Sequence, residues 1–284
     1  MEQDKNTWDI VVRPKSNLYN LNLKELMRYK DLILLLVKRD IVAVYKQTVL
    51  GPLWMIVQPI FTTLVYLFTF SATAKISTDG IPPILFYLMG LTFWNYFSDS
   101  LLKTSNTFIA NASVFGKVYF PRLVMPISVV ISNLVKLFLQ CLLLTLVYLY
   151  YLFTSNDVQF NFYAIIYIPL AVLFLGIFSL SLGVVFSAFT TKYRDLTFLL
   201  GFAVQLLMFG SCIVLPASIY GEKILSILMF NPIVPIIEAV KYFLTGHGLF
   251  SPFHLMFAFV TIILTFVIGV MVFNKTEKTF IDTV

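Results

Sequence analysis

The sequence predicts an all-helical integral membrane protein. Of its 284 residues, 59% are hydrophobic and only 12% are charged, and the mean hydropathy is +0.89. A soluble globular domain carries about twice that share of charged residues. The apolar residues also gather into runs of about 20, the helix length that crosses a bilayer core of roughly 30 Å. The composition therefore excludes a soluble globular protein.

Six apolar runs predict six membrane-spanning helices. They are residues 53–73, 84–102, 128–153, 162–188, 196–215 and 253–273. The third and fourth runs are longer than a perpendicular crossing needs, so we expect those helices to tilt or to project from the membrane. Residues 1–31 lack the apolar core of a cleavable signal peptide. Cys141 and Cys212 both lie inside apolar runs, so the sequence indicates no disulfide framework.

Charge orients these spans, because Lys and Arg concentrate in cytoplasmic loops. Sixteen of the 20 basic residues fall on the side that holds both termini, and Lys136 lies within the third span. The other side holds Lys75, Lys223 and Lys241. We therefore expect both termini in the cytoplasm and basic side chains near anionic lipid. The net charge of +6 comes with no nucleic-acid-binding motif, so we expect no nucleic acid partner.

The amino-terminal segment, residues 1–52, precedes the first span. Asn22 and Glu25 have the spacing of a capping box, and residues 23–46 mix apolar stretches with basic side chains. This pattern predicts a helix that lies in the headgroup layer. A simple anchor that orients the first span fits the same pattern.

Two segments between spans carry more sequence than a connection needs. Residues 103–122 are polar and end in Phe120-Pro121-Arg122, and a short helix there would face a soluble partner in the cytoplasm. Residues 216–252 are apolar but are interrupted by Asn231-Pro232 and Pro235. We expect two short helices that dip into the outer leaflet and cover a cavity, because irregular backbone at that depth needs protein or water beside it. Residues 192–195 form a tight charged turn.

Ionisable residues within the spans are few. Asp99 and Lys136 both belong to the inner half of the membrane, where a structural ion pair or contacts with the interface are more common than transport chemistry. His247 and His254 have no cluster of carboxylates or thiols nearby, so we expect no metal site.

Several motifs in a fixed order resemble those of one family. They are Arg39-Asp40-Ile41, residues 45–54 (Tyr-Lys-Gln-Thr-Val-Leu-Gly-Pro-Leu-Trp), Gln58-Pro59, residues 90–94, residues 116–122 with Pro126, Tyr193-Arg194-Asp195 and residues 231–238. In this order and spacing they resemble the membrane permease subunits of ABC-2 type polysaccharide exporters, which carry O-antigen, capsule or teichoic acid chains. The likeness runs almost end to end, although the tail, residues 274–284, resembles no carbohydrate-binding extension.

The resemblance implies a specific architecture. Such permeases are homodimers with six spans in residues 53–273, an amino-terminal interface helix and two ATPase subunits below. It also implies a coupling helix after the second span, a loop that meets the lipid diphosphate, and a gate between the last two spans. The implied coupling residues are Asn106, Asn111, Phe115 and Lys117, the loop residues are Leu50 and Gly51, and the gate residues are Asn231, Pro232, Pro235 and Glu238.

If the chain is such a permease, the energy for transport comes from another subunit. The sequence contains no G-x-x-x-x-G-K-[ST] phosphate-binding loop. We therefore expect a permease that is not itself an enzyme and binds no cofactor, with ATP and Mg²⁺ on the partner subunit. The implied cargo is a polyprenyl-diphosphate-linked polysaccharide, and the implied location is the bacterial inner membrane.

Two aromatic stripes are candidates for the wall of a pore. At helical spacing, the first span carries Trp54, Gln58, Phe61, Val65 and Phe68, and the fifth carries Phe198, Phe202, Gln205, Phe209 and Cys212. Sugar rings stack on aromatic faces and bond to amides, although plain helix packing is the simpler explanation of either stripe alone. A lipid diphosphate needs cations at the cytoplasmic mouth, and the candidates are Arg39, Lys46, Lys117 and Arg122. Lipid contact alone accounts for these cations as well.

Three rival functions remain open at this point. A secondary transporter normally shows internal repeats and carboxylates at the bilayer midplane, and the sequence shows neither. An intramembrane enzyme needs clustered acids, histidines or a nucleophile at one membrane face, and Asp99 alone is no cluster. An ABC-2 permease for another cargo, such as teichoic acid, a lipid or a drug, shares the fold and is the closest rival.

Overall fold

All regular structure in the described part of the chain is helical. The structure, a computed structural model, describes residues 23–46, 49–115, 120–155, 158–159 and 161–279. In chain order the elements are α1 Leu23–Arg28, α2 Lys30–Tyr45, η1 Gly51–Leu53, α3 Trp54–Tyr66, η2 Leu67–Thr73, α4 Pro83–Ser105, α5 Thr107–Ala110, α6 Ala112–Phe115, α7 Val124–Thr154, α8 Tyr163–Thr190, α9 Leu196–Phe209, η3 Ala217–Ile219, α10 Glu222–Leu228, α11 Ile233–Thr245 and α12 Pro252–Thr279. The all-helical part of the predicted fold class is confirmed.

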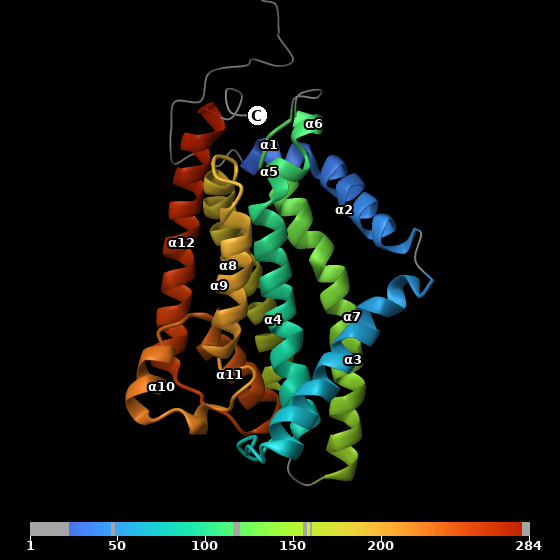
Figure 1. Ribbon diagram of the computed structural model, residues 1–284, viewed down its shortest axis with the longest axis vertical. Coiled ribbons are helices and arrows are strands. Elements are labelled where there is room, and N and C mark those ends of the chain that lie inside the picture. The colour runs from blue at the N-terminus through green and yellow to red at the C-terminus, as the bar shows by residue number, and fades with distance from the viewer. Residues whose placement is uncertain (1–22, 47–48, 116–119, 156–157, 160, 280–284) are drawn as a thin grey trace, which may run out of the picture.

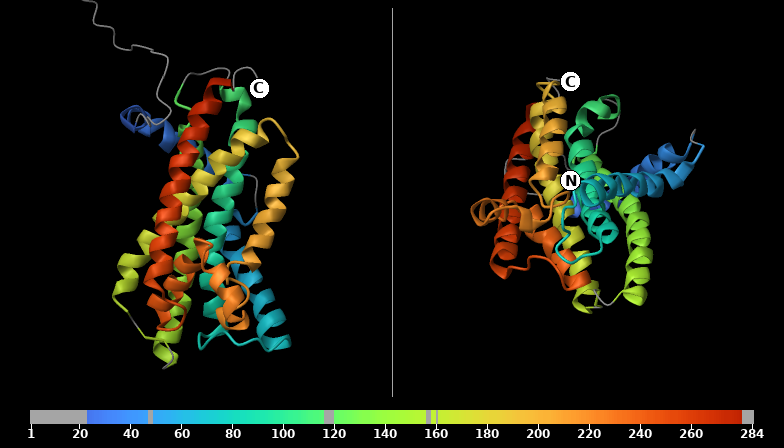
Figure 2. Two further views of the ribbon diagram at one scale, coloured as in Figure 1. Left: turned by 90° about the vertical axis from the view of Figure 1, so that its left-hand side faces the viewer. Right: turned by 60° about the horizontal axis from the view of Figure 1, so that its bottom comes forward.

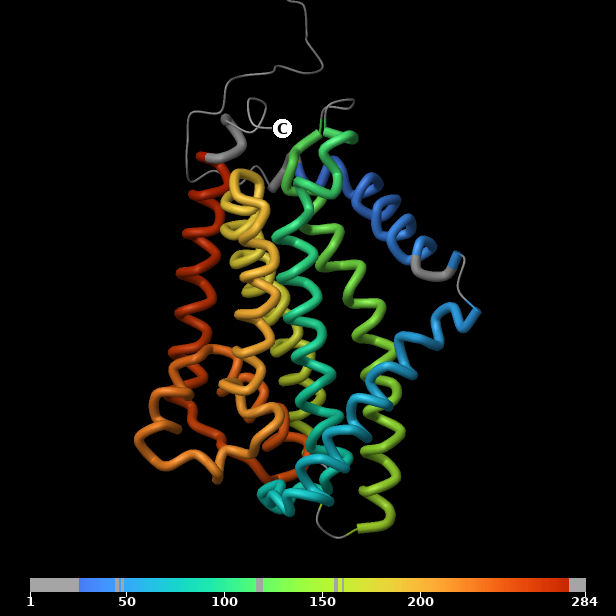
Figure 3. Tube along the Cα trace, in the orientation of Figure 1, coloured from blue at the N-terminus to red at the C-terminus, as the bar shows by residue number. Residues whose placement is uncertain are grey.

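The long helices run along the length of the molecule (Figure 1). Helices α1, α5 and α6 lie at one end, here called the α5 end. Helices α10 and α11 lie toward the opposite end, here called the α11 end. Helix α2 slopes away from the α5 end, and α3 starts clear of the bundle before it crosses α7 and packs on α4 (Figure 3).

Four helical stretches are long and apolar enough to cross a membrane. They are Gly51–Thr73, Val124–Thr154, Tyr163–Thr190 and Pro252–Lys275. They confirm four of the six predicted runs and the extra length of the third and fourth, whose helices hold 31 and 28 residues. Helix α4 has 23 residues but carries several polar side chains, and α9 has only 14. The complete six-span layout stays a prediction.

Helix α4 forms the centre of the bundle and packs against α3, α7 and α8. Most of its side chains are buried, with Phe93 and Phe97 fully enclosed. Two glycines of α8 permit the close approach of α4. A Cβ on Gly176 would lie 2.5 Å from Tyr96 Oη, and one on Gly183 would lie 2.5 Å from Thr104 Cβ. Small residues at helix crossings are typical of membrane bundles, where close packing replaces the hydrophobic effect.

The amino-terminal helix differs from the prediction of one continuous segment. It breaks at Tyr29, between α1 and α2. Leu26 and Leu36 are both buried in one cluster with Val124. In a straight helix these two leucines would stand about 15 Å apart, so the break lets both reach the start of α7. Leu34 and Leu35, on the far side of α2, are 61% and 62% exposed. The proposed cap, Asn22, lies outside the described residues.

The fifth predicted run ends earlier than expected. Helix α9 stops at Phe209, and Cys212 has a left-handed backbone with φ of 53°. Other segments satisfy carbonyl groups at this end, since Tyr220 Oη donates to Phe209 O over 2.7 Å and Asn231 Nδ2 donates to Gly210 O over 3.4 Å. Cys212 is fully buried and is not part of the α9 stripe, so that assignment was wrong.

Candidate functional site

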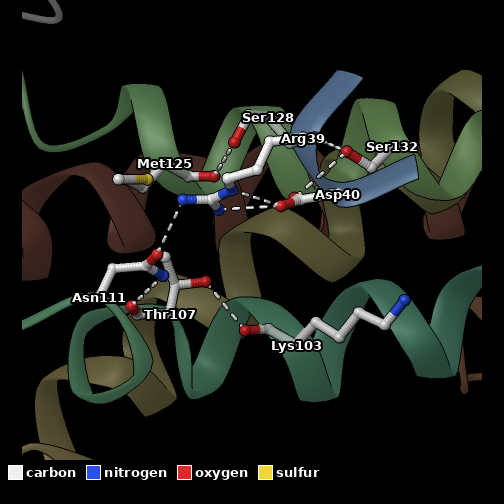
Figure 4. A network of polar contacts seen from close by, with 8 residues as sticks. All are labelled: Arg39, Asp40, Lys103, Thr107, Asn111, Met125, Ser128 and Ser132. Atoms are coloured by element: carbon white, nitrogen blue, oxygen red, sulfur yellow. Dashed lines mark hydrogen bonds and ion pairs between the residues drawn. The ribbon is translucent and has the colours of Figure 1, made fainter. Parts of the chain in front are cut away.

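Polar side chains join α2 to the segment between α4 and α7 (Figure 4). Arg39 donates from Nε and Nη2 to Asp40 Oδ1, over 3.0 and 2.8 Å, and from Nη1 to Asn111 Oδ1 over 3.4 Å. Ser132 Oγ of α7 donates to Asp40 Oδ2 over 3.4 Å. The guanidinium therefore ties α2 to Asn111, and its carboxylate partner ties α2 to α7. An ion pair as exposed as Arg39–Asp40 contributes about 1 kcal/mol or less, so its main effect is geometric.

The expected coupling helix is two single turns, α5 and α6, which meet at Asn111. The side chain of Asn111 donates from Nδ2 to Thr107 O over 2.9 Å, a local bond that competes with helix continuation. Asn106 ends α4, and the Phe115 ring stacks on Phe120 at 5.5 Å between centroids. Three predicted coupling residues thus lie in one short segment. Lys117 lies outside the described residues.

The cations predicted for a lipid diphosphate have different surroundings. Arg39 is held by Asp40 and Asn111, Lys46 is exposed just after α2, and Arg122 is half-buried in the turn before α7. The described residues therefore place Arg39 within a protein network, and leave Lys46 facing outward. Leu50 and Gly51 form the turn that opens α3, and φ of 50° at Gly51 is a conformation that favours glycine.

Asp99 and Lys136 form an ion pair, one of the two arrangements that the sequence favoured for them. Lys136 Nζ of α7 lies 2.8 Å from Asp99 Oδ2 of α4, and the side chains are 19% and 30% exposed. One helical turn away, Lys103 Nζ donates to Asn133 Oδ1 over 2.9 Å, and Asn133 Nδ2 donates to Ser100 Oγ over 3.1 Å. The two helices are therefore joined by a ladder of polar contacts near the α5 end.

The two aromatic stripes lie on exposed faces of α9 and of α3 with its continuation η2, which holds Phe68. The exposed fractions of Phe61 and Phe68 are 62% and 70%, and those of Phe198 and Phe202 are 85% and 62%. The other predicted members, apart from Cys212, are exposed too: Trp54, Gln58, Val65, Gln205 and Phe209. The described bundle does not cover these rings, so packing within one copy of the chain does not explain the stripes.

The predicted gate segment folds as two helices with a sharp corner. Helices α10 and α11 are bent by 102° about residues 229–232. Asn231 holds this corner, because Nδ2 donates to Ser211 Oγ over 3.0 Å and Oδ1 accepts from Ile233 N over 3.2 Å. Pro232 precedes α11, and Pro235 lies in its first turn, where a missing N–H costs no helical bond. Pro235 therefore makes no second break.

Comparison with known proteins decides the family. The model of the family described as ABC-2 type transporter matches residues 31–245, more than half of the chain. The chain belongs to this family. The matched range begins one residue into α2 and ends with α11, so it contains residues 103–122 and most of residues 216–252. It is a multi-pass transmembrane component of ABC-2 type.

Curated relatives of this ABC-2 permease carry a more specific name. An O-antigen export system permease protein RfbA of Klebsiella pneumoniae is 25% identical over 253 residues, 89% of this chain and 94% of the relative. A second K. pneumoniae protein of that name is 26% identical over the same shares of both chains. The RfbA of Myxococcus xanthus is 28% identical over 80% of this chain and 85% of its own length.

Sequence reasoning missed one buried pair of the permease. Lys241, counted as an outer loop cation, is fully buried in α11, and its Nζ lies 2.7 Å from Glu238 Oε1. It also donates to Cys212 O over 2.7 Å and stands 4.0 Å from the centroid of the Phe86 ring. Glu238 Oε2 accepts from Leu249 N over 3.1 Å. The three-residue spacing of Glu238 and Lys241 in an apolar helix is the signal that could have revealed the pair.

Proposed function

We propose that this chain is the permease subunit of an ATP-driven exporter that moves a lipid-linked, O-antigen-like polysaccharide from the cytoplasm across the bacterial inner membrane. The observation that carries the cargo class is the shared name of relatives that align along most of their length and of this chain. The sequence contains no phosphate-binding loop, which supports ATP hydrolysis by a separate partner. In the proposed complex, two copies of that partner bind two copies of this chain.

The α5 end is the proposed docking surface for the ATPase and faces the cytoplasm, as do both termini. The contact between Arg39 and Asn111 supports this role, because it links the α5–α6 segment to α2 without burying either deeply. A push on α5–α6 would then move α2, and α2 would carry the movement to the start of α3.

The proposed pore lies between two copies, with α3 and α9 toward it. The exposed aromatic faces of these helices support the proposal, since rings on a membrane protein surface need lipid, cargo or a second copy beside them. The gate is the bent pair α10–α11, which is placed toward the outer leaflet.

The first test is a detergent pull-down of the tagged chain from its native membrane, followed by mass spectrometry and an ATPase assay. We expect a stoichiometric ATPase subunit and ATP hydrolysis in the eluate, and loss of the surface glycan when the gene is deleted. A chain that elutes alone, with glycan export unchanged by the deletion, would overturn the proposal and revive the transporter and enzyme alternatives.

The coupling role has its own test in Arg39→Gln. Loss of the charge breaks the contacts with Asp40 and Asn111, so glycan export should fall while the ATPase still binds and hydrolyses ATP. Lys38→Gln is the matched control, because Lys38 is an exposed neighbour on the same helix. Equal export by the two variants would contradict a coupling role for Arg39.

A further inference from the structure

Three polar residues of α4 share one face of an otherwise buried helix. Asn95, Asp99 and Lys103 follow one another at four-residue spacing, so they form a stripe about 12 Å long near the α5 end. Asn95 and Asp99 are half-buried and Lys103 is exposed, whereas most other residues of α4 are enclosed. We call these three residues the α4 polar stripe.

The stripe faces away from the core. Helix α4 packs on α8 through Phe97, which stacks on Phe178, and through Thr104, which abuts Gly183. Residues 97 and 99 are about 200° apart around a helix, so the stripe lies on the opposite face from α8. Helices α3 and α9 both stand on that opposite side of α4 (Figure 2), and both contact it. The stripe thus points to the side of the bundle where the two aromatic stripes lie.

Two side chains of α7 hold the stripe in place. Lys136 pairs with Asp99, which leaves this pair without net charge. Asn133, only 3% exposed, accepts a hydrogen bond from Lys103. Two of the three stripe residues, Asp99 and Lys103, are therefore bonded to α7 where it packs on α4.

Lipid is a poor neighbour for this surface. Charged side chains within membrane-spanning segments are unfavourable in contact with lipid tails, and such residues usually face water, protein or a substrate path. An amide, a carboxylate and ammonium groups in a row offer both donors and acceptors, as sugar hydroxyls require. The Asp99–Lys136 pair has no net charge, so it does not bind an ion tightly. Several weak hydrogen bonds also suit a carbohydrate chain that must move past the site.

We propose that the α4 polar stripe, with Lys136, is a contact site for the hydroxyl groups of the exported carbohydrate and forms the rear wall of its path between α3 and α9. This inference rests on the proposed export function and adds a polar surface to the aromatic faces. The occupant is the sugar chain itself rather than its lipid anchor. The site offers both hydrogen-bond donors and acceptors to sugar hydroxyls, but it has little of the excess positive charge that a lipid diphosphate needs.

The first experiment measures water access. In a chain with Cys141 and Cys212 replaced by alanine, Asn95→Cys is treated with a charged, membrane-impermeant thiol reagent in vesicles that hold the ATPase complex. We expect labelling of the thiol introduced at position 95 and none at Phe138→Cys, whose site on α7 is 67% exposed and would face lipid. Labelling no faster than at position 138, or a disulfide that joins the introduced thiols of two copies, would overturn the proposal.

The second experiment measures export in cells that make their own lipid-linked glycan. Asn95→Leu should slow export about fivefold to tenfold, the effect of one or two lost hydrogen bonds, with complex recovery and basal ATPase activity unchanged. Phe138→Leu is the control and should export normally. Normal export by Asn95→Leu would overturn the stripe as a cargo contact. A gene deletion that leaves the surface glycan intact would instead overturn the export function itself.

Discussion

At the scale of single residues, Gly183 has the most direct test of packing. A Cβ at this position would approach Thr104 Cβ to 2.5 Å, at the crossing of α8 and α4. Gly183→Ala should therefore destabilise the protein by about 1–3 kcal/mol, the usual effect of overpacking. The measurement is the thermal midpoint of the purified complex in detergent. Gly201→Ala is the control, because a Cβ on Gly201 of α9 meets nothing within 4 Å.

The buried pair on α11 predicts a strong asymmetry between variants. Lys241→Met leaves Glu238 charged, 3% exposed and without its partner, and removing one member of a buried pair costs about 3–5 kcal/mol. Replacement of both residues, as Glu238→Gln with Lys241→Met, should be much milder because Gln still accepts from Leu249 N. Recovery of monodisperse protein by size exclusion after mild heating compares the two. Equal loss in both variants would show that packing alone, not charge, explains the effect.

The same residues show what sequence can predict at this scale. The Asp99–Lys136 pair was predictable, because two opposite charges at one membrane depth have few other partners. The position of Lys241 was not, because a count of loop cations assumes that every Lys between spans faces water. The spacing of Glu238 and Lys241 indicates that the two can pair, but the burial of that pair depends on the backbone at Cys212 and Leu249, which no local pattern specifies.

At the scale of elements, the two helices of the bent pair, α10 and α11, differ in how firmly they are held. Most of α11 is buried, and its Lys241–Glu238 pair is bonded to the segments before α10 and after α11. No residue of α10 is fully buried, and Ile224 and Ile227 are 55% and 71% exposed. If helices α10 and α11 act as a gate, α10 is therefore the helix that moves, and it turns about the corner at Asn231.

A cross-link can test that division of roles. The nearest contact of a Cβ on Gly210 with α10 is Leu228 Cδ2, at 3.8 Å. Gly210→Cys with Leu228→Cys, joined by a short reversible cross-linker in the background without native cysteines, should stop export while ATP hydrolysis continues. Reduction of the linker should restore export. Unimpeded export by the cross-linked protein would show that α10 need not move away from the end of α9.

Element boundaries were the least predictable feature of the fold. Within the apolar run at 196–215, Gly210 is only a weak stop signal for α9, and the carbonyl groups at that end are satisfied by Tyr220 and Asn231 from later in the chain. The break at Tyr29 has a similar cause, since it follows from the shared packing of Leu26 and Leu36. The corner at Asn231-Pro232 was predictable, because proline and its preceding residue disfavour continuous helix.

At the scale of the whole molecule, one copy of the chain leaves two aromatic faces uncovered. Periodicity predicted which residues of α3 and α9 share a face, and the structure confirms that those faces are exposed. Periodicity cannot say what covers them, because lipid, cargo and a second copy all favour aromatic surfaces. The α4 polar stripe lies on the same side of α4 as these two helices, which favours a path for a hydrophilic chain, since polar side chains are poor neighbours for lipid tails.

A double variant separates these possibilities. Phe61→Ala with Phe202→Ala removes one ring from each stripe, and both rings are 62% exposed, so the fold of the bundle should not change. If the rings stack on passing sugars, export should slow severalfold while recovery of the complex and its ATPase activity stay normal. Phe138→Ala with Phe253→Ala is the matched control, with exposed fractions of 67% and 63% on α7 and α12. Equal export by both variants would assign the stripes to lipid contact. Loss of the dimer in the first variant alone would assign them to the interface between two copies.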